Sequence, residues 1–456
     1  MTENSFFIGT PVMTHYLYEK GIETALDAMK EMSGVNAVMP YFASYQLHQY
    51  SGYRREAGTD RIVSSRYVSF RDEAFEGTCI KHPDCEGHLY ADRDILDEIA
   101  EAAASRGMDV YTRHLEPYVI TGIIPGLDQC REVDAEGREL DTVCFNHPDY
   151  REWLRATVSD LVATHPQVKG YKYGQERGGP INRSFGGDAA ACFCEHCSRK
   201  AADAGLDVEA ARAAMLALRD FACECREDAP PEDGYLTTFF RLLYRHPALL
   251  QWDDFYMESR QDHRRLAHAA IKAVRPEVQV GWHIDHGMSW DIFKRAQSEY
   301  ARMTPYSDWL SIAVYFDCMA PRSKGHFDRN YGGLLLRDLP VQLGWPAYLH
   351  LLGLQPEKEP SYEQIEGGHI CVSEDYVYRE TRRAVSGVDG GCRIYPRIGF
   401  DVGLYDSKAT PAQVKASVGA ALDGGADGLF VAREWHEITE ENARAFGDAL
   451  RERGAL

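Results

Sequence analysis

The sequence lacks the features of a membrane protein and of a nucleic-acid-binding protein. No run of about twenty apolar residues, the length that spans a bilayer, occurs in the 456 residues. Basic residues are in deficit, with 50 Lys and Arg against 70 Asp and Glu, which gives a formal net charge of -20. Such a charge repels phosphate backbones and anionic membrane surfaces at long range. We therefore expect neither a nucleic acid nor a membrane as a partner.

Secretion and disulfide signals are scarce as well. The first residues, Met-Thr-Glu-Asn-Ser-Phe-Phe, contain no basic segment followed by a long apolar one. The 12 cysteines are bunched, with Cys192, Cys194 and Cys197 in one short window and Cys223 and Cys225 in another. Bunching favours a metal site over disulfides. With 44% hydrophobic and 26% charged residues the composition is globular, and we expect a soluble, cytoplasmic protein.

No glycine-rich dinucleotide or phosphate fingerprint follows any of the strand-like segments, which argues against an open doubly wound sheet. Eight short apolar segments alternate with segments of helical spacing. This alternation is typical of a (β/α)8 (TIM) barrel of the α/β class. The predicted strands are residues 6–12, 35–39, 108–113, 168–173, 278–283, 309–316, 392–400 and 429–432.

Capping signals mark several of the intervening helices. Asp92 or Asp94 precedes a helix that Gly107 terminates, Pro148 occupies the first turn of another, and Thr410-Pro-Ala-Gln413 is a capping box. Helical spacing predicts further helices at residues 22–32, 257–274, 292–303 and 440–453.

The chain is longer than the barrel requires. A minimal barrel needs about 250 residues, and the surplus falls after the second, third, fourth and sixth predicted strands, at about 42–90, 116–145, 177–255 and 318–390. These are strand-to-helix connections, which form the active-site face of such barrels. We therefore expect one catalytic barrel over residues 1–456, with the insertions forming the walls of a pocket.

Aromatic residues are abundant near the predicted strand ends and in the insertions. Flat rings stack on the apolar faces of sugars, but they also pack loops together, and the sequence leaves both roles open for each ring. The rings concerned are Tyr41, Tyr45, Tyr50, Tyr53, Tyr118, Trp252, Trp290, Tyr315, Phe316 and Trp345.

The end of the fourth strand carries the best candidate for catalysis. Strand 168–173 continues into Gly174-Gln175-Glu176-Arg177. A carboxylate at the carboxyl end of a barrel strand points into the mouth of the barrel, where a general acid must protonate a leaving oxygen. Glu176 is therefore the predicted general acid/base, Gln175 could bind a substrate hydroxyl, and Arg177 could orient the carboxylate. A structural Glu176–Arg177 ion pair at the rim is the alternative.

The clustered cysteines fit a closed metal site. Two or three thiolates within a tight turn, with a fourth arriving from elsewhere, match tetrahedral zinc in which the protein fills every coordination position. Such a site holds a loop in place and has a structural role. The candidate ligands are Cys144, Cys192, Cys194 and Cys197, with His196 or Cys225 as replacements for Cys144; a cluster of free thiols is the alternative.

Four segments resemble a known family. Residues 144–151 (Cys-Phe-Asn-His-Pro-Asp-Tyr-Arg), 165–176 and 192–197 are similar to the middle of family 42 glycoside hydrolases, the zinc-containing β-galactosidases, and to other glycosyl hydrolases that share their barrel. Segment 425–435 looks like the eighth strand of that family. The resemblance implies a (β/α)8 barrel, zinc held by the four cysteines, Glu176 as the acid/base and a homo-oligomer.

The sequence departs from that family at two positions. The residue before the acid/base is Gln175 where the family has asparagine, and the segment 393–401, where the family has a nucleophilic glutamate, offers only Asp401. The second carboxylate is therefore open, and we order the candidates Asp401, Glu434 and Asp317. In the alternative readings Asp401 caps a turn, Glu434 pairs with Arg433, and Asp317 binds a substrate hydroxyl.

Two further functions remain open. His283 and Asp285 share a strand face and, with the segment Arg113-His114-Leu-Glu116, could bind a catalytic divalent ion in a lyase or isomerase acting on a sugar or sugar acid, although no third ligand of matching spacing is evident. Recognition of substrate hydroxyls by Arg113, His283 and Asp285 is the other reading. A non-catalytic carbohydrate-binding barrel is the second alternative.

The sequence therefore predicts a glycoside hydrolase that cleaves a small glycoside or oligosaccharide with two carboxylates and contains a structural zinc. The substrate-binding candidates are Gln175, Arg177, Arg113, His283, Asp285, Asp317, Tyr315 and Trp435.

Overall fold

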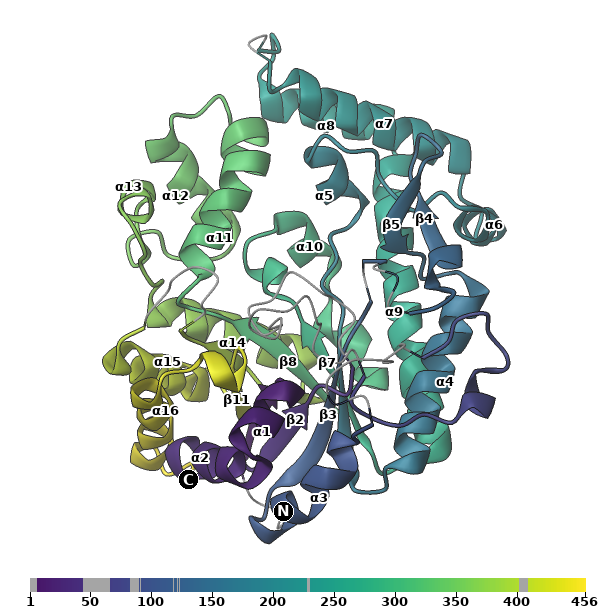
Figure 1. Cartoon of the computed structure of the whole chain (residues 1–456). Helices are drawn as coiled ribbons and strands as arrows, with labels where there is room; N and C mark the ends of the chain where they lie inside the picture. Colours follow the sequence, from purple (N-terminus) through teal and green to yellow (C-terminus); the bar gives the residue numbers. More distant parts are fainter. Residues whose placement is uncertain are drawn as a thin grey trace, which may run out of the picture.

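The computed structural model describes residues 6–43, 66–82, 90, 92–117, 119, 120, 122, 124–227, 230–401 and 409–456. Within these ranges a parallel sheet closes into a barrel, with β8 paired to β10, β10 to β11 and β11 to β1 (Figure 1). The (β/α)8 barrel is thus confirmed. Its strands are β1 (Phe7–Val12), β2 (Ala37–Pro40), β3 (Asp109–Leu115), β6 (Val168–Gly174), β7 (Gln279–Ile284), β8 (Trp309–Val314), β9 (Arg393–Ile394), β10 (Arg397–Gly399) and β11 (Gly428–Ala432).

Helices surround this barrel, and the predicted caps are present. The Asp94 side chain accepts hydrogen bonds from the first turn of its helix, and Thr410 and Gln413 form the capping box. The surrounding helices are α1 (Thr14–Lys20), α2 (Ile22–Ser33), α3 (Ile95–Ser105), α4 (Pro148–Thr164), α9 (Ala248–Val274), α10 (Ile292–Gln297), α14 (Glu374–Val388), α15 (Pro411–Asp423) and α16 (Glu440–Glu452).

Two predicted elements are interrupted. The seventh strand breaks between β9 and β10 at Tyr395-Pro396, where proline has no N–H to donate to a neighbouring strand. The helix predicted at 292–303 ends at Gln297 and is followed by the 3-10 helix η4 (Tyr300–Tyr306), which contains Pro305. Pro396 accounts for the break in the strand, whereas α10 ends at Gln297, well before Pro305.

The segments after β3, β6 and β8 contain additional elements on one side of the barrel, the upper side in Figure 1. They are the β4 (Arg131–Val133) and β5 (Glu139–Val143) hairpin, α5 (Pro180–Phe185), α6 (Glu195–Asp203), α7 (Val208–Glu224), α8 (Tyr235–Arg245), α11 (Met319–His326), the π-helix η5 (Phe327–Leu335), α12 (Val341–Leu351) and α13 (Tyr362–Glu366). Residues 44–65 and 83–89 of the insertion predicted at 42–90 lie outside the described residues. Tyr118, in the next predicted insertion, lies outside them as well.

The interior of the barrel is apolar at one end. Large rings fill it there, and the Phe7 and Tyr395 rings stack with their centroids 4.3 Å apart. Glycines on the neighbouring strands make room for these rings, since a Cβ on Gly170 would lie 2.0 Å from Tyr111 and one on Gly281 2.1 Å from Trp309. This plug of side chains closes the barrel below the polar residues described next.

Charged side chains form the next layer toward the carboxyl ends of the strands. Arg113, Lys172 and Arg397 are all buried in the barrel. Gly174 leaves space for Arg113, because a Cβ there would lie 2.5 Å from its guanidinium. Burial, with Arg397 and Arg113 nearby, holds the pKa of Lys172 well below its usual value. The positive charge of this layer therefore comes from the two arginines.

Among the described residues, no helix combines the length and the hydrophobicity that crossing a bilayer requires.

Candidate active site

A cavity of about 630 Å³ opens at the carboxyl ends of the barrel strands. Six of its lining residues come from or directly follow six different strands: Tyr41, Arg113, Glu176, His283, Arg397 and Glu434. Of the residues predicted from sequence as catalytic or substrate-binding, the cavity brings together Glu176, Glu434, Arg113, His283, Asp285 and Tyr315. Active sites of such barrels lie at this end.

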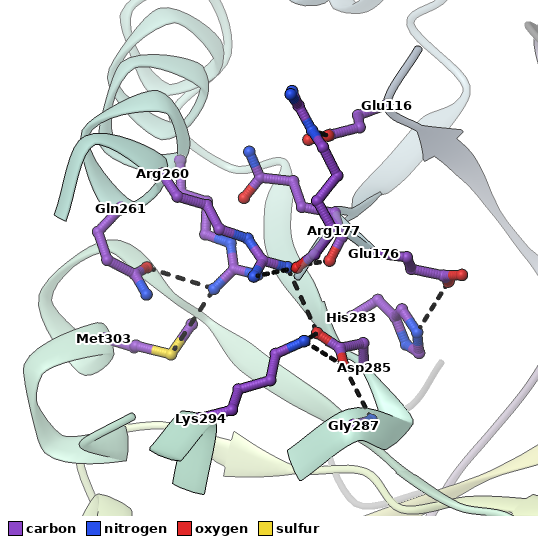
Figure 2. A network of polar contacts seen from close by, with 12 residues as sticks. Glu116, Glu176, Arg177, Arg260, Gln261, His283, Asp285, Gly287, Lys294 and Met303 are labelled. Atoms are coloured by element: carbon purple, nitrogen blue, oxygen red, sulfur yellow. Dashed lines mark hydrogen bonds and ion pairs between the residues drawn. The ribbon is translucent and has the colours of Figure 1, made fainter. Parts of the chain in front are cut away.

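Glu176 lies against His283 (Figure 2) and close to the positive charge of Arg113. Its Oε1 lies 3.1 Å from Nε2 of His283 and 3.7 Å from Nη2 of Arg113, and 27% of its side chain is exposed. Burial raises the pKa of Glu176, but the hydrogen bond from His283 and the positive charges of Arg113 and Arg397 outweigh burial and hold the pKa well below its ordinary value. Glu176 is therefore ionised at neutral pH.

His283 is held in one tautomer. Nη1 of Arg397 lies 2.8 Å from Nδ1 of His283, and because arginine can only donate, Nδ1 accepts. Burial and Arg397 keep the pKa of His283 well below its usual value, so the ring is neutral and carries its proton on Nε2. This Nε2–H donates to Glu176.

Glu434 has a different partner. Tyr41 Oη donates to Oε1 of Glu434 over 2.7 Å, and burial, with Glu434 adding to it, raises the pKa of Tyr41 well above its usual value. Among the described residues, the buried Oε2 of Glu434 has no hydrogen-bond partner. One oxygen of this carboxyl group is thus fixed, and the other is left for a proton or a ligand.

The two carboxylates belong to one connected ring of side chains. The Arg113 guanidinium carbon lies 5.7 Å from the Tyr41 ring centroid and so stands between Glu176 and the Tyr41–Glu434 pair. On the other side, Nη2 of Arg397 lies 3.5 Å from the Arg433 carbonyl oxygen, next to Glu434 in the chain. Glu176 and Glu434 therefore face the same cavity, and Arg113 and Tyr41 connect them.

Asp401, the first-ranked candidate for the second carboxylate, does not line this cavity. Its Oδ2 accepts hydrogen bonds from the N–H and Oγ1 of Thr439 at 3.1 and 2.8 Å, and Asn442 Nδ2 donates to both carboxylate oxygens at 2.9 and 3.0 Å. The side chain thus fixes the start of α16 to the end of β10. Geometry here favours Glu434 over Asp401, in line with the alternative reading that Asp401 caps a turn.

Four other candidates also lie outside the cavity lining. Arg177 pairs with Glu116 and donates to the Val143 carbonyl at 2.6 Å, so the rim pair with Glu176 is not formed. Adjacent residues of an extended segment point to opposite sides, which accounts for this arrangement. Gln175, Asp317 and Trp435 are buried in the surrounding protein.

Asp285 is held by cations and not in a metal-ligand set (Figure 2). Lys294 Nζ lies 2.6 Å and Arg260 Nη2 3.4 Å from its carboxylate. Burial raises the pKa of Asp285, but these two cations outweigh it and lower the pKa. In the described ranges, the groups whose donor atoms converge as metal ligands are the four predicted cysteines and the trio Asp94, Asp97 and His165, neither of which is at the cavity.

The four predicted cysteines come together in the insertion after β3 and β6. Their sulfur atoms lie within 4.8 Å of one another, and all four residues are buried. Cys144 Sγ is 3.5 Å from the sulfur atoms of Cys194 and Cys197. Sulfur atoms bound to one zinc at about 2.3 Å lie about this far apart. The cluster joins the end of β5 to the start of α6.

If the cluster holds zinc, the purified protein should contain about one zinc per chain. Replacing Cys144 or Cys197 by serine should reduce this content to nearly zero, because a closed site needs all four thiolates. Metal analysis by mass spectrometry measures the outcome, and the exposed Cys223→Ser is the matched control, which should keep its zinc. Zinc retained in Cys144→Ser would show that this cysteine is not a ligand.

Two residues of the ring were not predicted as site residues. For the Tyr41 ring the sequence leaves sugar stacking and loop packing open, and in the segment that contains Arg397 it offers only Asp401 as a candidate. The signal for Arg397 is a charged residue within a predicted barrel strand, residues 392–400, of a fold whose active site is built at the strand ends.

Solved structures with the same barrel fold include glycoside hydrolases. No sequence-family model and no curated protein matches the chain. A β-galactosidase from the haloarchaeon Halorubrum lacusprofundi superposes with a TM-score of 0.55 at 15% identity, over 99% of this chain and 58% of that one. A GH42 β-galactosidase from G. stearothermophilus gives 0.53 at 13% identity, over 100% and 58%. This chain thus spans little more than half the length of these two β-galactosidases.

A third structure matches along its whole length. The glycoside hydrolase domain of PgaB from Bordetella bronchiseptica has a TM-score of 0.50 at 13% identity and covers 99% of both chains. At these identities the similarity establishes the fold. The barrel expected from the resemblance to family 42 is therefore confirmed.

Proposed function

We propose that this protein is a glycoside hydrolase that cleaves a small glycoside or oligosaccharide with Glu176 and Glu434 as its two carboxylates. The observation that carries the proposal is that both residues line one cavity at the carboxyl end of the barrel, joined through Arg113 and Tyr41. Glycosidases place two carboxyl groups on either side of the bond to be broken. The similarity in fold to glycoside hydrolases supports this reading.

The environments of the two residues suggest their roles. A general acid must carry a proton at the working pH, and the depressed pKa of Glu176 opposes this. We therefore assign Glu434 as the proton donor and Glu176 as the ionised partner, the reverse of the acid/base role expected from the family resemblance. Glu434 protonates the glycosidic oxygen as the bond breaks, and Tyr41 then stabilises the carboxylate that remains.

Glu176 acts at the anomeric carbon, either as a nucleophile or by deprotonating a water. His283 and Arg113 hold its carboxylate in place, and Arg397 fixes the tautomer of His283. The rings of Trp290 and Tyr315 line the same cavity and offer flat surfaces to a sugar.

We also propose roles for the insertions and for the cysteine cluster. The insertions contribute to the cavity wall, as Pro321, Gly325 and Arg329 from the α11 region do. The four-cysteine cluster would hold a structural zinc that braces this side of the barrel. Reduced, clustered thiols fit a cytoplasmic location. A homo-oligomer stays a prediction.

A panel of nitrophenyl glycosides tests the activity. We expect at least one to be hydrolysed, with the anomeric form of the first product, measured by NMR, distinguishing attack by Glu176 from attack by water. Activity should survive EDTA, which spares a closed thiolate site, whereas a divalent-metal lyase or isomerase would lose it. A panel without any hydrolysis, together with sugar binding, would instead indicate a carbohydrate-binding barrel.

A further inference from the structure

Helix α8 carries a stripe of apolar side chains that face solvent. Leu236, Phe240 and Tyr244 are 39%, 51% and 88% exposed, and their spacing of four residues puts them on one side of the helix. The other side is buried through Tyr235 and Phe239. Figure 1 shows α8 with α7 at the upper edge of the molecule, away from the barrel. The described chain therefore leaves the apolar stripe uncovered.

A neighbouring segment extends this apolar surface at the start of the helix. The Tyr235 N–H donates to the Asp338 carboxylate over 2.8 Å, so the next residue, Leu339, adjoins the start of α8. Leu339 is 40% exposed. We call the stripe together with Leu339 the α8 face. Monomeric proteins seldom leave large contiguous apolar surfaces in water, and such surfaces mark sites of association.

The two ends of α8 carry opposite charges. Glu232 and Asp233 precede its first turn, Arg245 is its last residue, and all three are exposed. Asp233 pairs with Arg241 of the same helix. Among the described residues, neither Glu232 nor Arg245 has an ion-pair partner. The α8 face is therefore flanked by one unpaired acid and one unpaired base.

This pattern is complementary to itself. If two copies of α8 pack antiparallel about a two-fold axis at Phe240, the two Phe240 rings meet at the axis and Leu236 of each copy meets Tyr244 of the other. The register holds because Leu236 and Tyr244 each lie one turn, about 6 Å along the helix, from Phe240. Glu232 of each copy then lies beside Arg245 of the other. A parallel arrangement would bring like charges together.

Other partners fit these charges less well. Helices that bind membrane surfaces are rich in lysine and arginine, whereas α8 contains two arginines and no lysine, and the chain has a formal net charge of -20. An unrelated protein would need a surface that matches both ends of the helix. A second copy of this chain supplies that surface by symmetry.

We infer that the α8 face is the interface of a homodimer, in which the α8 helices of two copies pack antiparallel about a two-fold axis at Phe240. The inference does not depend on the proposed function, and it gives the predicted homo-oligomer an interface. A contact limited to this face is smaller than a standard interface of roughly 1,600 Å². We therefore expect a dissociation constant in the micromolar range.

The oligomeric state of the full chain tests the inference. Light scattering and sedimentation velocity, run from about 1 to 200 µM, should show a monomer that converts to a dimer. Phe240→Asp puts two carboxylates at the axis and should raise the dimer Kd by at least about 100-fold. Tyr378→Asp, which alters an exposed ring on α14, is the matched control and should dimerise like the parent.

Charge reversal tests the antiparallel arrangement. Arg245→Glu should raise the dimer Kd by about tenfold, because the new carboxylate faces Glu232 of the other copy. Adding Glu232→Arg to this variant should restore dimerisation. An unchanged Kd in Arg245→Glu would contradict the antiparallel pairing. Melting temperatures should match that of the parent, since these side chains are exposed.

Three results would overturn the inference. The first is a monomer over the whole concentration range. The second is a dimer that persists in Phe240→Asp. The third is a monomer that binds vesicles of phosphatidylserine and phosphatidylcholine and loses this binding in Phe240→Asp, which would assign the α8 face to a membrane surface.

Discussion

Substituting Glu434 by alanine should slow the hydrolysis of a methyl glycoside far more than that of a dinitrophenyl glycoside. The methoxide leaving group needs a proton, whereas dinitrophenolate departs without one. The expected loss for the methyl glycoside is about 10²- to 10⁴-fold, the usual contribution of a general acid. Steady-state kcat values for the two substrates measure the difference.

Glu176→Ala should instead slow both substrates to a similar extent, since either leaving group requires attack at the anomeric carbon. If Glu176 is a nucleophile, azide should restore the reaction by entering the space of the missing carboxylate, and the glycosyl azide should have the inverted configuration. In Glu434→Ala, azide should give the retained configuration. The opposite pattern would assign the proton donor to Glu176, as the resemblance to family 42 implies.

Asp401→Asn provides the control for this pair. The asparagine keeps an oxygen that can accept from Thr439 or Asn442 but loses the charge and the second acceptor. We expect kcat within about twofold of the parent and a lower melting temperature, because hydrogen bonds to a charged group contribute about 1.5–3 kcal/mol each. A large fall in kcat with an unchanged melting temperature would return Asp401 to the list of catalytic candidates.

The contrast between Asp401 and Glu434 shows the limit of sequence reasoning at this site. Both residues lie two positions beyond the end of a barrel strand, so spacing gives them equal standing. Asp401 has a φ of 59°, in the left-handed region. Its carboxylate accepts hydrogen bonds from Thr439 and Asn442, which lie 38 and 41 residues further along the chain. The direction of its side chain depends on this distant contact, which no local pattern encodes.

Local patterns in the sequence were sufficient to predict most of the fold. Apolar segments of strand length, the caps at Asp94 and Thr410, and the cysteine spacing predicted the barrel, its helix starts and the four-cysteine cluster. The same position relative to a strand end predicted Glu176, Glu434 and Asp401, and of these Glu176 and Glu434 line the cavity. The insertion helices were not predicted individually, because their packing against the barrel and against one another determines them.

The surroundings of Glu176 allow the proposed roles to be tested by pH. Ionised Glu176 is required for attack, so kcat/KM falls on the acid side as pH drops through its pKa. The Nε2–H of His283 and the nearby charges lower this pKa below the ordinary value of about 4.3. The acid limb of the wild-type profile should therefore lie below the usual range of a glutamate.

Removing the hydrogen-bond donor His283 should shift the acid limb of the kcat/KM profile to higher pH. In His283→Ala the burial of Glu176, which raises its pKa, is less opposed, and the limb should shift to higher pH by about one to two pH units, the equivalent of one hydrogen bond to a charged group. His283→Gln, which can still present an N–H to Glu176, should shift it less. Circular dichroism across the same pH range confirms that the fold persists. An acid limb that stays in place in His283→Ala would mean that His283 does not keep Glu176 ionised, and the assignment of Glu434 as proton donor would lose its basis.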